Sequence, residues 1–132
     1  MEQIIKKAHD MARDKGFWDD PRNKPELLML IVSELAEALE ALRKDHYAHE
    51  KVSESLLNDL LMDEVDEEFF LLEGSWKDGF EKYVKSSFED EIADVAIRLF
   101  DLCGGLGVNL DRHIKLKMKY NSMRGYKHGK KF

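Results

Sequence analysis

Apolar residues recur along this chain at intervals of three and four, the spacing of one face of an α-helix. The intervening breaks are rich in Gly, Pro, Asn and Asp, as turns are. Pro25 suits the first turn of a helix, and Asn109 or Asp111 can cap another. No alternation typical of a strand is found. The pattern therefore predicts an all-α bundle of four to five helices, over about residues 2–15, 25–44, 54–72, 88–103 and 109–123, with a loop between Gly74 and Gly79 and a stop at Gly104–Gly107.

The two most apolar of these helices carry acidic residues on or beside their apolar faces. At 100° per residue, Glu34 falls inside the apolar arc of its helix, and Glu37 lies at the rim. Glu91 lies at the edge of the arc of the later helix, and Asp94 lies one step further out. A three-residue step keeps each pair on one side of its helix. A carboxylate that faces a helix–helix interface costs free energy unless something neutralises it.

The chemistry that fits such carboxylates is a divalent metal site. Mg²⁺ and Mn²⁺ take hard oxygen ligands, and facing helices of a bundle can supply them. The sequence thus predicts that Glu34, Glu37, Glu91 and Asp94 bind Mg²⁺, with Mn²⁺ as a substitute. The alternative is that these are ordinary solvated edge positions, because acidic residues flank most amphipathic helices. Two pairs in the two most apolar helices favour the metal site.

Composition indicates one small intracellular domain over residues 1–132. The chain is 43% hydrophobic and has two prolines, which suits a single modest core. Its one cysteine, Cys103, excludes an internal disulfide framework and lies in an apolar run, so we expect a core residue in a reducing compartment. No signal peptide or membrane span is found, and a cytoplasmic protein is expected.

Charge is unevenly distributed along the chain. From Arg112 to the end, over residues 112–132, there are eight Lys and Arg and no Asp or Glu, which leaves 13 basic and 27 acidic residues elsewhere. An acidic body with a basic tail can bind a metal and a polyanion together. It is also what a solvated acidic domain with a disordered basic end would show. The acidic body argues against a nucleic-acid partner, since duplex phosphates would be repelled over most of the surface.

Four segments in order resemble a known family. Residues 33–41 (SELAEALEA) and 90–99 (DEIADVAIRL) are similar to the two acidic signatures of the MazG-like, all-α nucleoside triphosphate pyrophosphohydrolases. Residues 16–18 (GFW) resemble the loop before the first acidic helix in that family. The tail, 117–132, is similar to the ending of its compact members (KMKYNSMRGYKHGKKF).

The resemblance implies an enzyme that cleaves a (d)NTP between the α- and β-phosphates. The products are the monophosphate and pyrophosphate, and Mg²⁺ is required. It implies that the four acids hold the metal, and Glu37 is our candidate to accept a proton from the attacking water.

Candidate substrate-binding residues lie in the tail and in the GFW loop. Lys117, Asn121 and Arg124 step by four and three, so they share a helix face and are expected to hold the triphosphate. Trp18 is a candidate to stack on the base; a loop aromatic that closes over the core is the alternative.

One departure from the family pattern concerns spacing. Glu37 and Glu91 are 54 positions apart, more than double the gap expected in the shortest members, so residues 46–87 are interpreted as an insertion. The insertion carries a rival acidic pair, Glu64 and Glu67, on the apolar face of its own helix. Glu91 and Asp94 are preferred because the apolar run after them matches the family in register.

A function of another class remains open. In a non-catalytic oligomerisation or interaction protein, the acids would be surface charge and the apolar faces would bind partners. In either case, apolar arcs this broad predict a homo-oligomer, either a homodimer or a homotetramer.

Overall fold

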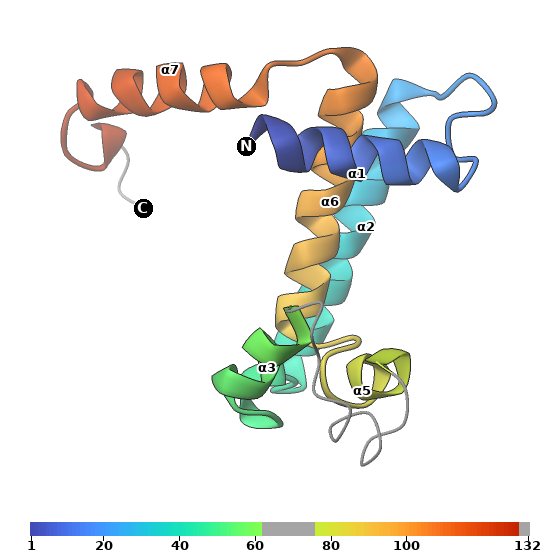
Figure 1. Cartoon of the computed structure of the whole chain (residues 1–132). Helices are drawn as coiled ribbons and strands as arrows, with labels where there is room; N and C mark the ends of the chain where they lie inside the picture. The colour runs from blue at the N-terminus through green and yellow to red at the C-terminus, as the bar shows by residue number, and fades with distance from the viewer. Residues whose placement is uncertain (62–75, 130–132) are drawn as a thin grey trace. The chain divides into compact units, whose positions relative to one another are not determined.

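The computed structural model describes residues 1–61 and 76–129, and within them every regular element is a helix. The prediction of an all-α protein is confirmed. Six α-helices are found in this part of the chain, more than the four to five expected (Figure 1). They are α1 (Glu2–Asp14), α2 (Lys24–Arg43), α3 (Glu54–Leu61), α5 (Trp76–Tyr83), α6 (Phe88–Leu106) and α7 (Leu110–Ser122), with short 3₁₀ helices η1 (Ala48–Glu50) and η2 (Tyr126–Gly129).

Contacts between residues divide the chain into two compact units, which are described separately. The first unit comprises residues 1–22 and 97–132, and the second comprises residues 23–96. Helix α6 contributes its second half to the first unit and its first half to the second. The prediction of a single domain stays a prediction.

The helix starts follow the capping rules that the sequence suggested. The side-chain oxygen of Asn23 accepts a hydrogen bond from Glu26 N at 3.0 Å, and Pro25 lies in the first turn of α2. Asn109 caps α7 in the same way, accepting from Arg112 N at 3.0 Å. The choice between Asn109 and Asp111 as the α7 cap is thus decided for Asn109.

Helix α6 does not stop at Gly104 as expected, but continues through Gly105 to Leu106. Both glycines lie against side chains of the first unit. A Cβ at Gly104 would lie 2.6 Å from the Cβ of His9, and one at Gly105 would lie 2.2 Å from the ring of Trp18. These glycines therefore allow close packing on a continuing helix, and the turn comes at Gly107, whose φ is +67°.

The prediction that a loop extends from Gly74 to Gly79 is also wrong at Gly79. Gly79 lies inside α5 and is buried. Trp76 and Phe80, four residues apart, stack with ring centroids 5.3 Å apart, a pairing that supports a helix at this spacing. The end of the helix predicted over 54–72 lies outside the described residues.

Each unit has a small core. In the first unit, Ile5 and Ala8 of α1 and Leu102 and Cys103 of α6 are buried, and burial raises the pKa of the Cys103 thiol. The expectation that Cys103 is a core residue is confirmed. Among the described helices, none combines the length and apolar character needed to cross a membrane.

In the second unit, the first half of α6 lies beside α2 (Figure 1). The buried residues of α2 include Ala38 and Ala41, which are only 3% and 6% exposed. Small side chains at such positions let a neighbouring helix approach closely.

Candidate metal centre

Helices α2 and α6 bring three of the four predicted metal ligands together. One carboxylate oxygen from each of Glu34, Glu37 and Glu91 lies within 4.8 Å of the other two. Glu34 and Glu91 are 8% and 7% exposed, whereas Glu37 is exposed. The position of Glu34 inside an apolar arc correctly indicated its burial. The cluster is therefore a pair of buried carboxylates with a third at the solvent-facing rim.

The electrostatics of the cluster favour a cation. Loss of solvation on burial, a hydrogen bond shared with Glu37 and the charges of Glu37, Asp90 and Asp94 raise the pKa of Glu91 to about 7. A proton at Glu91 thus relieves the repulsion among these acids near neutral pH. A divalent cation with a preference for oxygen ligands would relieve it more completely.

Asp94 lies one turn further along α6 and is half-buried. Its charge contributes to the raised pKa of Glu91, but it is not one of the three acids whose oxygens converge. Its role as a fourth ligand stays a prediction. The rival pair, Glu64 and Glu67, lies outside the described residues.

Hydrogen bonds among residues 86–91 fix the first turn of α6. Ser87 is fully buried; its hydroxyl accepts from Asp90 N at 3.2 Å, and its carbonyl accepts from Glu91 N at 3.0 Å. Asp90 in turn accepts from Ser86 N at 2.8 Å. Ser86 has a φ of +61°, a conformation that non-glycine residues rarely adopt and that the surrounding contacts maintain.

Glu89, also on this turn, was not foreseen from the sequence. Partial burial raises the pKa of its carboxyl, but hydrogen bonds from Ala48 N and from the side chain and backbone of His49 outweigh that effect and lower the pKa to about 2. Its partners are 40 residues away in sequence, and no periodicity connects them. Glu89 therefore ties the η1 segment to the start of α6.

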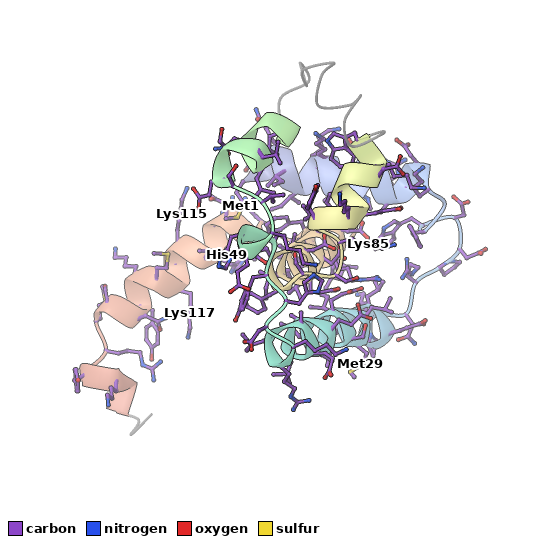
Figure 2. The ribbon with its side chains drawn as sticks, turned by 90° about the horizontal axis from the view of Figure 1, so that it is seen from below. Met1, Met29, His49, Lys85, Lys115 and Lys117 are labelled. Carbon is purple, nitrogen blue, oxygen red and sulfur yellow. The ribbon has the colours of Figure 1, made fainter. Side chains whose placement is uncertain are left out.

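Two of the predicted triphosphate-binding residues, Lys117 and Asn121, lie on α7 in the first unit. Arg124 lies two residues after the end of this helix, so the expectation that all three share a helix face is wrong for Arg124. Lys117 and Arg124 lie over the same ring, that of Tyr120, at 4.9 Å and 5.8 Å from its centroid. Figure 2 shows Lys115 and Lys117 projecting from this helix. The side-chain oxygen of Asn121 is buried, with no hydrogen-bond partner among the described residues. That these residues serve the acidic cluster of the second unit stays a prediction.

Trp18 is held against α6 in the first unit. Its indole N–H donates to Asp101 Oδ1 at 2.8 Å, and its ring packs on Gly105. Asp101 Oδ1 also lies 2.8 Å from His9 Nδ1. These contacts match the alternative in which the loop aromatic closes over the core, and base stacking by Trp18 stays a prediction. On a helical wheel Asp101 falls outside the apolar arc of α6, next to Asp94, so periodicity did not single it out, and its partners His9 and Trp18 are distant in sequence.

Comparison with known proteins found no match to this chain among protein families, curated sequences or solved structures.

Proposed function

We propose that this protein is a Mg²⁺-dependent nucleoside triphosphate pyrophosphohydrolase of the MazG-like kind, acting in the cytoplasm. The observation that carries the proposal is the convergence of Glu34, Glu37 and Glu91 from two helices that are far apart in sequence. Two of these acids are buried and one is exposed, so the cluster has an inner, desolvated side and an outer side open to a ligand.

In this proposal, Glu34, Glu37 and Glu91 hold the ion, and Asp94 completes the set. Bound Mg²⁺ would neutralise charge on the phosphates and lower the pKa of a water molecule. Water adds across the anhydride between the α- and β-phosphates, giving the monophosphate and pyrophosphate. Glu37 takes the proton of the water, because it alone of the three converging acids is exposed at the rim.

Lys117 of α7 and Arg124, which follows that helix, are the proposed ligands of the triphosphate. Lys117 supplies a compact charge, and Arg124 supplies a planar fork of donors that suits phosphate oxygens. In the conformation of the structure, both lie on the ring of Tyr120, which restricts their orientation. Asn121 would contact phosphate or sugar, and Trp18 would contact the base.

A panel of canonical and damaged (d)NTPs tests the activity directly. We expect release of pyrophosphate, not phosphate, with Mg²⁺, a slower or comparable rate with Mn²⁺, and no release with excess EDTA. The assay separates monophosphate from diphosphate products by ion-exchange chromatography. Turnover of no nucleotide, or products that contain the diphosphate, would reject the proposal.

One observation favours an assembly of several copies, whether or not the protein is an enzyme. Helix α2 has a second apolar stripe beside its buried one, and its members are between 42% and 53% exposed. Met29, 61% exposed, lies next to this stripe and points away from α6 (Figure 2). The α2 stripe consists of Leu28, Val32, Leu35, Leu39 and Leu42.

The α2 stripe has alternating steps of four and three, the spacing by which two helices pack along a common seam. An exposed apolar patch of this kind is typical of a protein interface. We therefore propose that the chain forms a homodimer or homotetramer through α2. This is also the feature that a non-catalytic oligomerisation protein would need.

Leu35→Glu, at the centre of the α2 stripe, should shift the protein to a monomer in size-exclusion chromatography with light scattering. The reason is that a charge would be buried in the seam of every dimer. Met11→Glu is the matched control, since Met11 is 58% exposed on α1 and lies outside the stripe. A wild-type monomer on dilution, or an oligomer unchanged by Leu35→Glu, would reject the interface.

A further inference from the structure

The segment after α2 returns to the start of α6 and connects the two helices by backbone hydrogen bonds. His46 N donates to the carbonyl of Ala41 at 3.0 Å, and the carbonyl of His46 accepts from Phe88 N at 2.8 Å. One residue thus bridges the last turns of α2 and the first turn of α6. We refer to residues 44–52, which include η1, as the strap.

Glu89 makes the second connection between the strap and α6. Its Oε2 accepts from Ala48 N at 2.9 Å, and its Oε1 accepts from His49 N at 3.3 Å and lies 2.7 Å from His49 Nδ1. In Figure 2, which looks along α6 from its first turn, His49 lies on the strap beside that turn. Both carboxylate oxygens of Glu89 accept hydrogen bonds from the strap. Glu89 therefore connects the strap to α6 and is not a further metal ligand.

The strap belongs to the second unit and is packed against its other residues. Ala48 and Val52 are 2% and 7% exposed. Tyr47 lies edge-on to Phe88, with ring centroids 5.9 Å apart, and it also contacts the ring of His49 at 5.2 Å. The hydrogen bonds of Glu89 therefore add to the side-chain packing that already holds the strap against the start of α6.

The connections lie close to the acidic cluster along both helices. Ala41 follows Glu37 by four residues, and Glu89 precedes Glu91 by two, so each lies within about 6 Å, measured along the helix axis, of the nearest acid of the cluster on its helix. When all three carboxylates of the cluster are ionised and no cation is bound, they repel one another, and that repulsion tends to separate α2 from α6. The strap opposes the separation.

We propose that Glu89 is a positioning residue that, through Ala48 and His49, holds α2 and α6 at the spacing where Glu34, Glu37 and Glu91 share one divalent cation. The inference rests on the metal site of the proposed function, but not on hydrolysis. Preorganised ligands bind a cation more tightly because less order is lost on binding.

Binding of Mn²⁺ alone to the full chain tests the inference without a substrate. Glu89→Gln keeps the side chain's size, but its amide nitrogen cannot accept from Ala48 N or His49 N, so at least one connection is lost. We expect Mn²⁺ affinity to fall about tenfold or more by electron paramagnetic resonance, as the loss of a charge-assisted hydrogen bond suggests. His49→Ala removes the contacts of the ring with Glu89 and Tyr47 but leaves both backbone hydrogen bonds to Glu89, and a smaller loss, about threefold, is expected.

Asn23→Ala is the matched control, because it removes the cap at the opposite end of α2 and lowers stability without touching the strap. Its Mn²⁺ affinity should equal that of the wild type. A second readout does not involve metal: spin labels on Ala36→Cys and Ala93→Cys, both exposed, report the spacing of α2 and α6. The distance distribution should broaden with Glu89→Gln and not with Asn23→Ala.

The outcomes separate this inference from the proposed function. Wild-type protein that binds Mn²⁺ but hydrolyses no nucleotide would reject the enzyme and leave the positioning role to be decided by the variants. Unchanged affinity and spacing in Glu89→Gln would overturn the inference, as would wild-type protein that binds no Mn²⁺. If Glu89→Gln does not fold, His49→Ala decides by the same two measurements.

Discussion

Glu37→Gln is expected to lower the rate of pyrophosphate release by about 10²- to 10⁴-fold, the usual cost of losing a general base. The change keeps the size of the side chain and removes one charge from the cluster of three acids. The fold should survive, because Glu37 is exposed and glutamine has a similar helix propensity. Initial rates at saturating Mg²⁺, together with circular dichroism of the variant, check both parts.

Glu40→Gln provides the control on the same helix. Glu40 lies three residues further along α2, is exposed and pairs with Arg43 at 3.4 Å and Lys44 at 3.8 Å. Surface pairs of this kind contribute little to stability, and the rate should stay within about twofold of the wild type. Equal rates for the two variants, whether both normal or both impaired, would contradict the role given to Glu37.

The second large effect is the change in stability on replacing Glu91, and the sign of this change depends on whether a metal ion is bound. Without metal, Glu91→Gln should increase the free energy of unfolding at pH 8 by about 2 to 3 kcal/mol, because the neutral amide avoids ionising a buried carboxyl whose pKa is raised to about 7. With Mn²⁺, the order should reverse, since the wild type gains stability from the ion and the variant lacks a ligand. Urea unfolding in EDTA and in Mn²⁺ measures both.

The same raised pKa sets the pH dependence of the metal-free wild type. The unfolded chain ionises Glu91 near pH 4.5, whereas the folded chain keeps the proton up to about pH 7. The folded state therefore binds more protons in this window, so stability should fall as pH rises through it and level off above pH 7. Glu89 acts in another window: its lowered pKa stabilises the fold above pH 4.5, and this contribution is lost between that pH and about 2. A wild-type stability that rises from pH 5 to 7 would contradict the assignment for Glu91.

Periodicity alone was enough to place α1, α2, α6, α7 and the start of α3, but it did not predict α5. The position of Glu34 among apolar neighbours predicted its burial, because a side chain on the apolar face of an amphipathic helix turns toward the core. Glu91 was placed only at the edge of the α6 arc, and the structure buries it as fully as Glu34. Pro25, expected in the first turn, placed the start of α2 within one residue of the observed Lys24, but the cap, Asn23, was not predicted.

Features that depend on partners distant in sequence were not predictable in this way. Gly104 and Gly105 read as a helix stop, since a single sequence does not show that His9 and Trp18 pack against them. Gly79 was likewise predicted to lie in a loop because glycine is typical of loops, and its packing inside α5 is not visible in the sequence. Glu89 sits in an ordinary acidic first turn, and only the return of the strap gives it a role.

Helix α7 has thirteen residues, none of them buried. A helix of this length has little cooperativity of its own in water, and most helices of globular proteins owe their stability to packing. The helix–coil equilibrium of α7 is therefore linked to ligand binding. If Lys117 and Arg124 bind an anion, part of the binding free energy would be used to order the helix. Calorimetry of such binding would show a more negative entropy than contacts with a preformed helix would give.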